Sequence, residues 1–276
     1  MRVSARGLDF EVRVRGPVGG EPVLLLHGFP QHSGCWRAVA DRLHAAGLRT
    51  IAPDQRGYSP GARPADVRAY RVEECADDAV AILDALGLES AHVVGHDWGA
   101  TAAWFAAARH PERVRTLTAV SVPHPAAFAE ALAESTDQRL KSAYITLFRR
   151  RGLAERLLLA FGAAPLRFQC TATGLPAAAV DAYVDPLTEP GALTGALNWY
   201  RATPPAGLGA LGPVDCPTTF VWSDRDVACD RRGAELTEHY VDAAYELVVL
   251  EGVSHWIPTQ APEALTEAII KRIESS

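Results

Sequence analysis

The chain has 276 residues, 48% of them hydrophobic, and its formal net charge is −6 at pH 7, without a basic block that would indicate a nucleic-acid partner. No apolar run is long enough to span a bilayer, and the N-terminal stretch lacks the apolar core of a signal peptide, so we expect no membrane partner and a cytoplasmic location. The five cysteines are scattered without a CxxC pair, which predicts neither a disulfide framework nor a zinc site.

Short apolar runs alternate with helical patterns over the first 122 residues. The pattern predicts strands at 9–15, 22–26, 48–52, 91–94 and 114–122, and helices at 36–46, 72–86 and 99–110. The run PVLLL at 22–26 is continuously apolar, as expected of a strand that is covered on both faces. Strands that alternate with helices predict a mostly parallel sheet with right-handed crossovers.

The pattern changes between residues 124 and 212, where the sequence predicts helices and loops but no convincing central strand. Beyond this segment, strands are predicted at 217–222 and 245–250, and helices at 231–240 and 262–273. We therefore predict a core formed by residues 1–123 and 213–276, with an all-helical cap at 124–212. Such a cap is expected over the carboxyl edge of the strands, where open α/β sheets bind ligands.

One segment decides the chemistry: VVGHDWGA at 93–100 follows a predicted strand and opens a predicted helix. Gly95, Asp97 and Gly99 form the glycine–x–nucleophile–x–glycine pattern of a nucleophile elbow. The turn is so tight that side chains at the two glycines would collide with neighbouring backbone. The alternative is an ordinary strand–turn–helix connection in which Asp97 only caps the helix.

Two loops supply the expected hydrogen-bond donors for a developing oxyanion. The sequence HGFP at 27–30 follows the apolar strand at 22–26. In folds with such a nucleophile elbow, the loop after that strand contributes one backbone N–H group to the oxyanion site, and the residue after the nucleophile contributes the other. These residues are Phe29 and Trp98.

The remaining members of a triad follow in the order nucleophile, acid, base. Asp226 lies at the usual distance past a predicted strand and is the preferred acid, with Asp224 as a rival; the alternative is that Asp226 is a surface turn residue. His255 lies in the loop after the last predicted strand. A loop histidine alone is usually just solvated, but beside Asp97 and Asp226 it is the candidate base.

A carboxylate nucleophile suits a saturated carbon better than an ester carbonyl, because attack on an ester would form a high-energy anhydride. Asp97 is already ionised near neutral pH. Its attack would leave an alkyl ester, which water deprotonated by His255 would then hydrolyse. The chemistry therefore predicts an epoxide or an alkyl halide as substrate.

Five stretches carry a resemblance that covers nearly the whole chain: HGFP (27–30), DQRGY (54–58), GHDWG (95–99), LNWYR (197–201) and SHW (254–256). With them the chain resembles the soluble epoxide hydrolase branch of the α/β-hydrolase superfamily. Family members use two cap tyrosines to assist the leaving oxygen. The resemblance implies Tyr200 and Tyr144 for this role, with Tyr183 as a rival, and neutral phenols suit it because they donate at pH 7.

Two alternatives stay open. A dehalogenase would need N–H donors for a halide ion, and Trp98 and Trp199 are the candidate indoles, although Phe29 stands where one dehalogenase branch has asparagine. Fluoroacetate dehalogenases share HGFPQ but carry arginine directly after the nucleophile, where this chain has Trp98. The third hypothesis is a small-molecule-binding fold without catalysis.

The expected partners are a small apolar epoxide and water, without cofactor or metal; the sequence is compatible with a homodimer but does not determine the oligomeric state. Apolar side chains around the predicted site suggest this substrate class. The expected pocket walls are Trp98, Phe128, Phe148, Trp199 and Trp256. For most of these residues, packing in the core is an equally good explanation.

Overall fold

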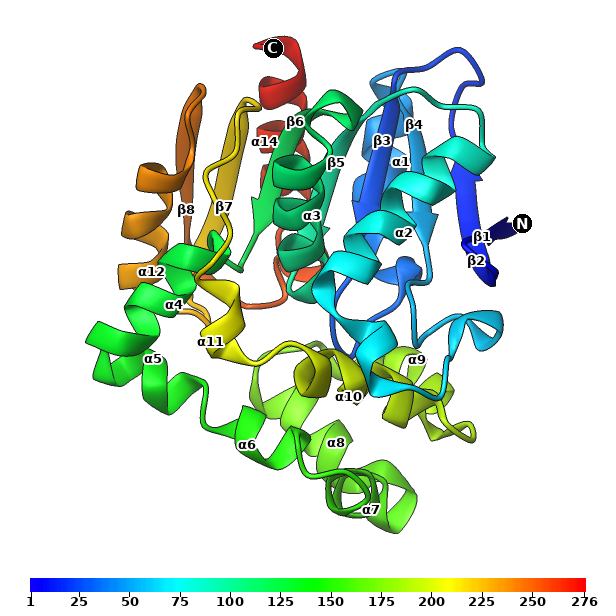
Figure 1. Cartoon of the computed structure of the whole chain (residues 1–276), viewed down its shortest axis with the longest axis vertical. Coiled ribbons are helices and arrows are strands. Elements are labelled where there is room, and N and C mark those ends of the chain that lie inside the picture. Colours follow the sequence, from blue (N-terminus) through cyan, green and yellow to red (C-terminus); the bar gives the residue numbers. More distant parts are fainter.

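A sheet of eight strands forms the centre of the computed structural model, which describes residues 1–276 apart from the side chains of residues 205 and 206 (Figure 1). The strands are β1 (Arg2–Ala5), β2 (Leu8–Arg15), β3 (Pro22–Leu26), β4 (Arg49–Pro53), β5 (Ala91–His96), β6 (Val114–Val120), β7 (Thr218–Arg225) and β8 (Tyr245–Ser254). Their order is β1-β2-β4-β3-β5-β6-β7-β8. From β4 to β8 all neighbours pair in parallel, and β1 and β2 pair antiparallel at one edge. The predicted mostly parallel sheet is therefore confirmed.

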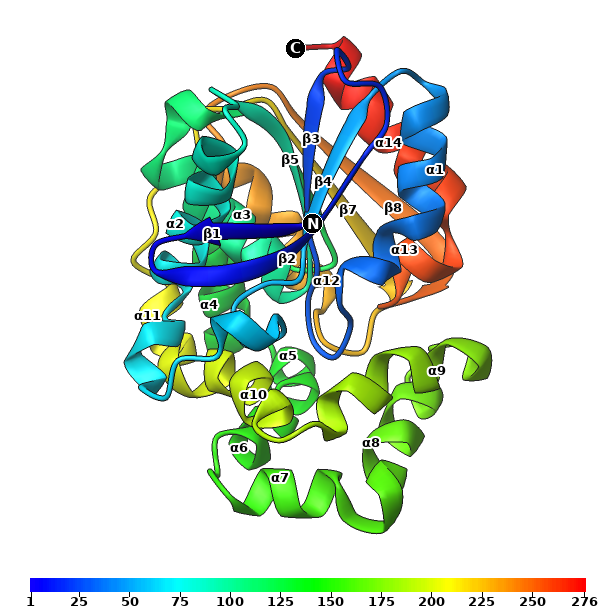
Figure 2. The ribbon, with the colours of Figure 1, turned by 90° about the vertical axis from the view of Figure 1, so that its right-hand side faces the viewer.

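Helices cover both faces of the sheet (Figure 2). The α-helices of the core are α1 (Arg37–Ala45), α2 (Val72–Ala85), α3 (Trp98–Arg109), α12 (Arg231–Leu236), α13 (Ile257–Gln260) and α14 (Pro262–Glu274). Short 3-10 helices are η1 (Ser33–Trp36), η2 (Pro60–Ala62), η3 (Val67–Tyr70), η4 (Pro111–Arg113) and η6 (Thr237–Tyr240). Helices α1, α13 and α14 lie on one face, and α2 and α3 lie on the other. Within the described part of the chain, no helix has both the length and the apolar composition needed to cross a bilayer.

Strand β3 shows why the sheet is a rigid frame. All five of its residues are buried. Val23 and Leu25 pack with residues of α1 and α14, whereas Leu24 and Leu26 pack with residues of α2 and α3. Full burial of one such side chain stabilises the fold by roughly 2 kcal/mol. The strand therefore ends at a fixed point, where the loop that begins with His27 leaves the sheet.

Between β6 and β7, every regular element of the described chain is helical. These elements are α4 (Pro125–Glu134), α5 (Thr136–Lys141), α6 (Tyr144–Phe148), α7 (Leu153–Leu158), α8 (Ala160–Ala172), α9 (Ala177–Val184), η5 (Asp185–Thr188), α10 (Ala192–Ala202) and α11 (Pro205–Leu208). Helices α5 to α10 lie across the ends of the strands (Figure 1). Helix α4 packs against α12 of the core, so the boundaries at 124 and 212 stay a prediction.

Candidate active site

Asp97 sits in a sharp turn between β5 and α3. Its backbone has φ 54° and ψ −124°, a left-handed conformation that a non-glycine residue rarely adopts without support from its surroundings. A Cβ atom at Gly95 would lie 2.2 Å from the carbonyl oxygen of Gly99, and one at Gly99 would lie 2.1 Å from that of Leu26. The predicted collision with backbone is therefore present at both glycines of the elbow.

The loop after β3 brings a donor to the Asp97 carboxylate. The backbone N–H of Phe29 donates to Oδ1 of Asp97 over 2.7 Å, and the N–H of Trp98 also stabilises the charged carboxylate. The approach is so close that a Cβ atom at Gly28 would lie 2.2 Å from the same Oδ1. Both predicted oxyanion donors therefore interact with the carboxylate of Asp97.

The DQRGY stretch holds this loop in place. The backbone N–H of Gln55 donates to Nε2 of His27 over 3.0 Å, and Tyr58 packs edge-on against the same imidazole at 4.6 Å between ring centroids. Arg56 forms two hydrogen bonds of 2.6 Å with buried Asp78. The DQRGY stretch thus supports the loop that carries Phe29 and supplies no reacting group itself.

His255 lies between two carboxylates. Its Nδ1 lies 2.9 Å from Oδ2 of Asp226, and its Nε2 lies 3.5 Å from Oδ2 of Asp97. Asp226 is buried and accepts hydrogen bonds from the N–H groups of Ala228 and Cys229 over 2.7 and 2.9 Å. The three predicted triad residues are therefore brought together at the carboxyl ends of three strands.

The rival acid lies elsewhere. Asp224 is exposed, and its Oδ1 accepts a hydrogen bond from the backbone N–H of Gly252 over 2.7 Å. This contact stabilises the turn within β8 and leaves the Asp224 carboxylate with no contact to His255 among the described hydrogen bonds and ion pairs. Asp226 lies in the loop after β7 and is buried, and both properties favour it over Asp224 as the acid that orients His255.

Two buried side chains hold the backbone of His255, and the sequence analysis assigned neither a role. Nε2 of His96 donates to the His255 carbonyl oxygen over 2.9 Å, and Oγ of Ser121 donates to the same oxygen over 3.1 Å. Burial lowers the pKa of His96 to about 4, so its ring is neutral. The signal for these residues in the sequence was weak: His96 directly precedes Asp97, and Ser121 lies near the end of the predicted strand at 114–122.

The charges of the triad are coupled. Burial alone would lower the pKa of His255, but the carboxylates of Asp226 and Asp97 outweigh it and raise this pKa to about 10. Burial would raise the pKa of Asp97, yet the hydrogen bond and charge of His255 lower it overall. The free site therefore holds an imidazolium ion between two carboxylates at neutral pH.

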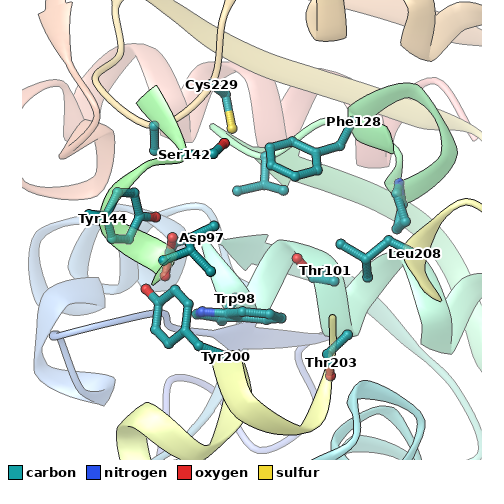
Figure 3. A pocket seen from close by; sticks show the side chains of 14 residues that line it. Asp97, Trp98, Thr101, Phe128, Ser142, Tyr144, Tyr200, Thr203, Leu208 and Cys229 are labelled. Atoms are coloured by element: carbon teal, nitrogen blue, oxygen red, sulfur yellow. The ribbon is translucent and has the colours of Figure 1, made fainter. Parts of the chain in front are cut away.

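Tyr144 and Tyr200, from α6 and α10, flank Asp97 (Figure 3). Their ring centroids lie 6.1 Å apart. Burial, followed for Tyr144 by the charge of Asp97, raises the pKa of both phenols above the ordinary value of 10. Both phenols are therefore neutral near pH 7 and keep their O–H groups as donors.

Two cavities meet at Asp97, and Tyr144, Tyr200 and Ala228 also border both. The first, here called the apolar chamber, has a volume of about 60 Å³, and the second, the wide chamber, about 310 Å³. The apolar chamber is also lined by Trp98, Thr101, Val122, Pro125, Phe128, Ser142, Ile145, Thr203, Leu208 and Cys229. The wide chamber is also lined by Phe29, Pro30, Phe148, Leu166, Gln169, Cys170, Thr173, Val227, His255 and Trp256. Their linings are mostly apolar, with a few polar groups near Asp97.

Most of the predicted wall residues reach these chambers. Trp98 and Phe128 line the apolar chamber, and Phe148 and Trp256 line the wide chamber. Trp199 lines neither of them: it is buried behind Trp98 at 5.8 Å between ring centroids, and its indole N–H donates to the carbonyl oxygen of Arg56 over 2.8 Å. The contacts of Trp199 are thus those of a residue that fixes α10 to the core.

Tyr183, the rival phenol, is also remote from the two chambers. It packs against His32 at 5.3 Å between ring centroids and is absent from both linings.

Within the described residues, no group of histidine, cysteine, aspartate and glutamate side chains is arranged to hold a metal ion.

Comparisons with known proteins agree with this geometry. A family model described as alpha/beta hydrolase fold matches residues 21–262. The chain is 31% identical to the AB hydrolase superfamily protein YfhM of Bacillus subtilis, over 99% of this chain and 97% of that protein. It is 30% identical to epoxide hydrolase A of Mycobacterium tuberculosis, over 98% and 95%. The crystal structure of a Bacillus megaterium epoxide hydrolase in complex with an inhibitor has a TM-score of 0.89 and 26% identity, over 99% of this chain and 100% of that chain.

Proposed function

The chain belongs to the α/β-hydrolase fold family, and from this premise we propose that it is an epoxide hydrolase that converts an apolar epoxide into a vicinal diol. The observation that carries the proposal is the position of two neutral phenols beside a carboxylate nucleophile. Tyr144 and Tyr200 border both chambers at the point where Asp97 does. An epoxide held there meets the nucleophile and two proton donors together.

In the first step, Asp97 attacks a ring carbon of the epoxide. Its Oδ1 is occupied by the Phe29 N–H, so Oδ2 is the oxygen available for attack. A carbon–oxygen bond forms to Oδ2 while the ring carbon–oxygen bond breaks, and the electron pair passes to the ring oxygen. Tyr144 and Tyr200 donate hydrogen bonds to this oxygen as charge develops, and one of them supplies its proton.

In the second step, water hydrolyses the alkyl ester on Asp97. His255 removes a proton from water through Nε2, and the resulting hydroxide attacks the carbonyl carbon of the ester. The N–H groups of Phe29 and Trp98 stabilise the oxyanion. Collapse of this intermediate releases the diol and restores the carboxylate, and the proton taken from water stays on His255, which restores the imidazolium of the free site.

The first step prepares the base for the second. In the free site, two carboxylates hold the proton on His255. Alkylation converts Asp97 into a neutral ester and removes one of them. The pKa of His255 then falls, so the imidazolium gives its proton to the phenolate left by the first step, and the neutral imidazole can then accept a proton from water.

The indole contacts argue against a dehalogenase. A departing halide ion needs N–H donors, and the candidates were Trp98 and Trp199. The Trp199 indole donates to the carbonyl oxygen of Arg56. The Trp98 ring packs edge-on against the Tyr200 ring, with 5.0 Å between the centroids. With the Trp199 N–H group already paired, the pair of indole donors that a halide ion would need is incomplete.

The test is a direct comparison of two substrate panels. The purified chain is given terminal and internal epoxides, including styrene oxide, and a matched set of chloro- and bromoalkanes, and diol and halide release are measured side by side. We expect diol from the epoxides and no halide above the background of an Asp97→Ala variant. Halide release without diol would assign the site to dehalogenation, and neither product would favour a non-catalytic binding function.

A further inference from the structure

A glutamine of helix α5 makes a buried connection between the inserted helices and the core. Gln138 is fully buried, at 0% exposure. Its Nε2 donates to the carbonyl oxygen of Ala228 over 2.8 Å and to Oγ of Ser142 over 3.0 Å. Its Oε1 accepts a hydrogen bond from the backbone N–H of Asp230 over 2.9 Å. All the polar atoms of this amide therefore have partners.

The segment that Gln138 contacts is the acid loop, residues 226–230, which follows β7. Asp226 at its start accepts hydrogen bonds from the N–H groups of Ala228 and Cys229. The Gln138 amide contacts the loop directly on both sides of Cys229, at the Ala228 carbonyl and the Asp230 N–H. One side chain thus fixes the part of the loop that orients the carboxylate of Asp226.

A second residue of the same helix acts on the other end of this loop. Lys141 lies one turn after Gln138, and its Nζ donates to the main-chain carbonyl oxygen of Asp226. The two side chains therefore hold the acid loop from one face of α5. Helix α5 also leads directly into α6, whose first residue is Tyr144.

We propose that Gln138 is a positioning residue that ties the acid loop to α5 so that Asp226 can orient His255 for hydrolysis of the alkyl-enzyme. The inference rests on the proposed function, because it assigns Gln138 to the second of its two steps. The first step needs the charge of Asp97 and the phenols. The second needs His255 oriented by Asp226, and a buried loop with unpaired backbone groups would shift until water or another partner satisfies them.

The test separates the two half-reactions in single-turnover experiments with excess enzyme. Styrene oxide, or whichever epoxide the wild-type chain turns over, is mixed rapidly with each variant, and the alkyl-enzyme is followed by quenching and mass spectrometry. For Gln138→Leu, which removes the three contacts while keeping a similar volume, we expect alkylation within about twofold of wild type and hydrolysis slowed at least roughly tenfold, the effect of one or two lost buried hydrogen bonds.

The matched variant is Gln138→Glu, which keeps the size and the oxygen facing Asp230 but replaces the donor to the Ala228 carbonyl. We expect its hydrolysis to be slowed as well. Lys141→Met tests the same loop from a more exposed position and is expected to slow hydrolysis by about threefold. Glu189→Gln removes a different contact between the inserted helices and the core, the ion pair with Arg63, and should leave the ratio of the two rates unchanged.

The outcomes are distinct. If Gln138→Leu and Lys141→Met slow alkylation and hydrolysis in proportion, or if they slow neither step, Gln138 is only a structural residue and the inference is overturned. If the wild-type chain forms no adduct with any epoxide, the proposed function itself fails. A selective loss of hydrolysis with a normal alkylation rate supports the positioning role.

Discussion

Nε2 of His255 lies 3.5 Å from Oδ2 of Asp97, the carboxylate oxygen that the backbone N–H of Phe29 leaves free. The same imidazole binds Asp226 through Nδ1 at 2.9 Å. The base is thus oriented by one carboxylate and faces the other, which is the side chain that it would later help to hydrolyse. This separation of tasks leads to predictions for each residue.

Replacing His255 with glutamine should stop the reaction after the first step. The nucleophile and the phenols remain, so Asp97 is still alkylated, but no base activates water. We expect hydrolysis to fall by about 10²–10⁴-fold, the usual contribution of a general base. Mass spectrometry of the intact variant should find one substrate molecule bound covalently to each chain, and peptide mapping should locate it at Asp97. A variant that stays free of adduct while the wild type turns over would contradict the two-step scheme.

Replacing Asp97 with asparagine should lower the pKa of His255 below about 10, because the amide mimics the neutral ester and removes one of the two carboxylates that raise it. Asp226 remains, so part of the elevation should persist. Titration of nitrogen-15-labelled histidine by NMR would measure both values. Since only neutral imidazole accepts a proton, the hydrolysis rate of the wild-type alkyl-enzyme should rise with pH through this lowered pKa. An unchanged His255 pKa in the variant would contradict the proposed preparation of the base.

Replacing both Tyr144 and Tyr200 with phenylalanine should abolish epoxide opening while leaving the fold intact. The rings still fill the space between the two chambers, but no hydroxyl donates to the leaving oxygen. Each single variant should retain activity reduced by about tenfold or more, since one donor remains. Alkylation rates measured by quenched flow test this, with thermal unfolding as the control. Wild-type alkylation by the double variant would remove the phenols from the mechanism.

Replacing Gly99 with alanine should destabilise the chain by about 3 kcal/mol, because the added Cβ would lie 2.1 Å from the carbonyl oxygen of Leu26, at the end of buried β3. The matched control is Gly19→Ala, whose Cβ meets nothing within 4 Å. Urea unfolding of the two variants gives the difference. Equal stabilities would mean that the elbow tolerates a side chain at this position.

Much of this site could be predicted from the sequence because parallel strands end at one edge of the sheet. The elbow at Asp97 and the loops that carry His255 and Asp226 follow recognisable strands. The position just past a strand already favoured Asp226 over Asp224 in the sequence, and the structure adds that Asp226 is buried while Asp224 is exposed.

Other features left little or no trace in the sequence. Strand β1 is only four residues long, and its pairing with β2 at the sheet edge shows in no periodic pattern. Trp199 belongs to a recognisable stretch, yet only its contact with Arg56 reveals that it faces the core. Gln138 contacts a loop about 90 residues later in the chain, and no local pattern predicts such a hydrogen bond.

The central claim is that water attacks the ester carbonyl of Asp97 and not the substrate carbon. A single turnover of excess enzyme in oxygen-18 water, followed by mass spectrometry of the peptide around Asp97, tests it most directly. We predict that the heavy oxygen appears in the carboxylate of Asp97 and that the first diol released carries none. Label in the diol with an unlabelled Asp97 would mean direct attack of water on the epoxide and would contradict the covalent mechanism.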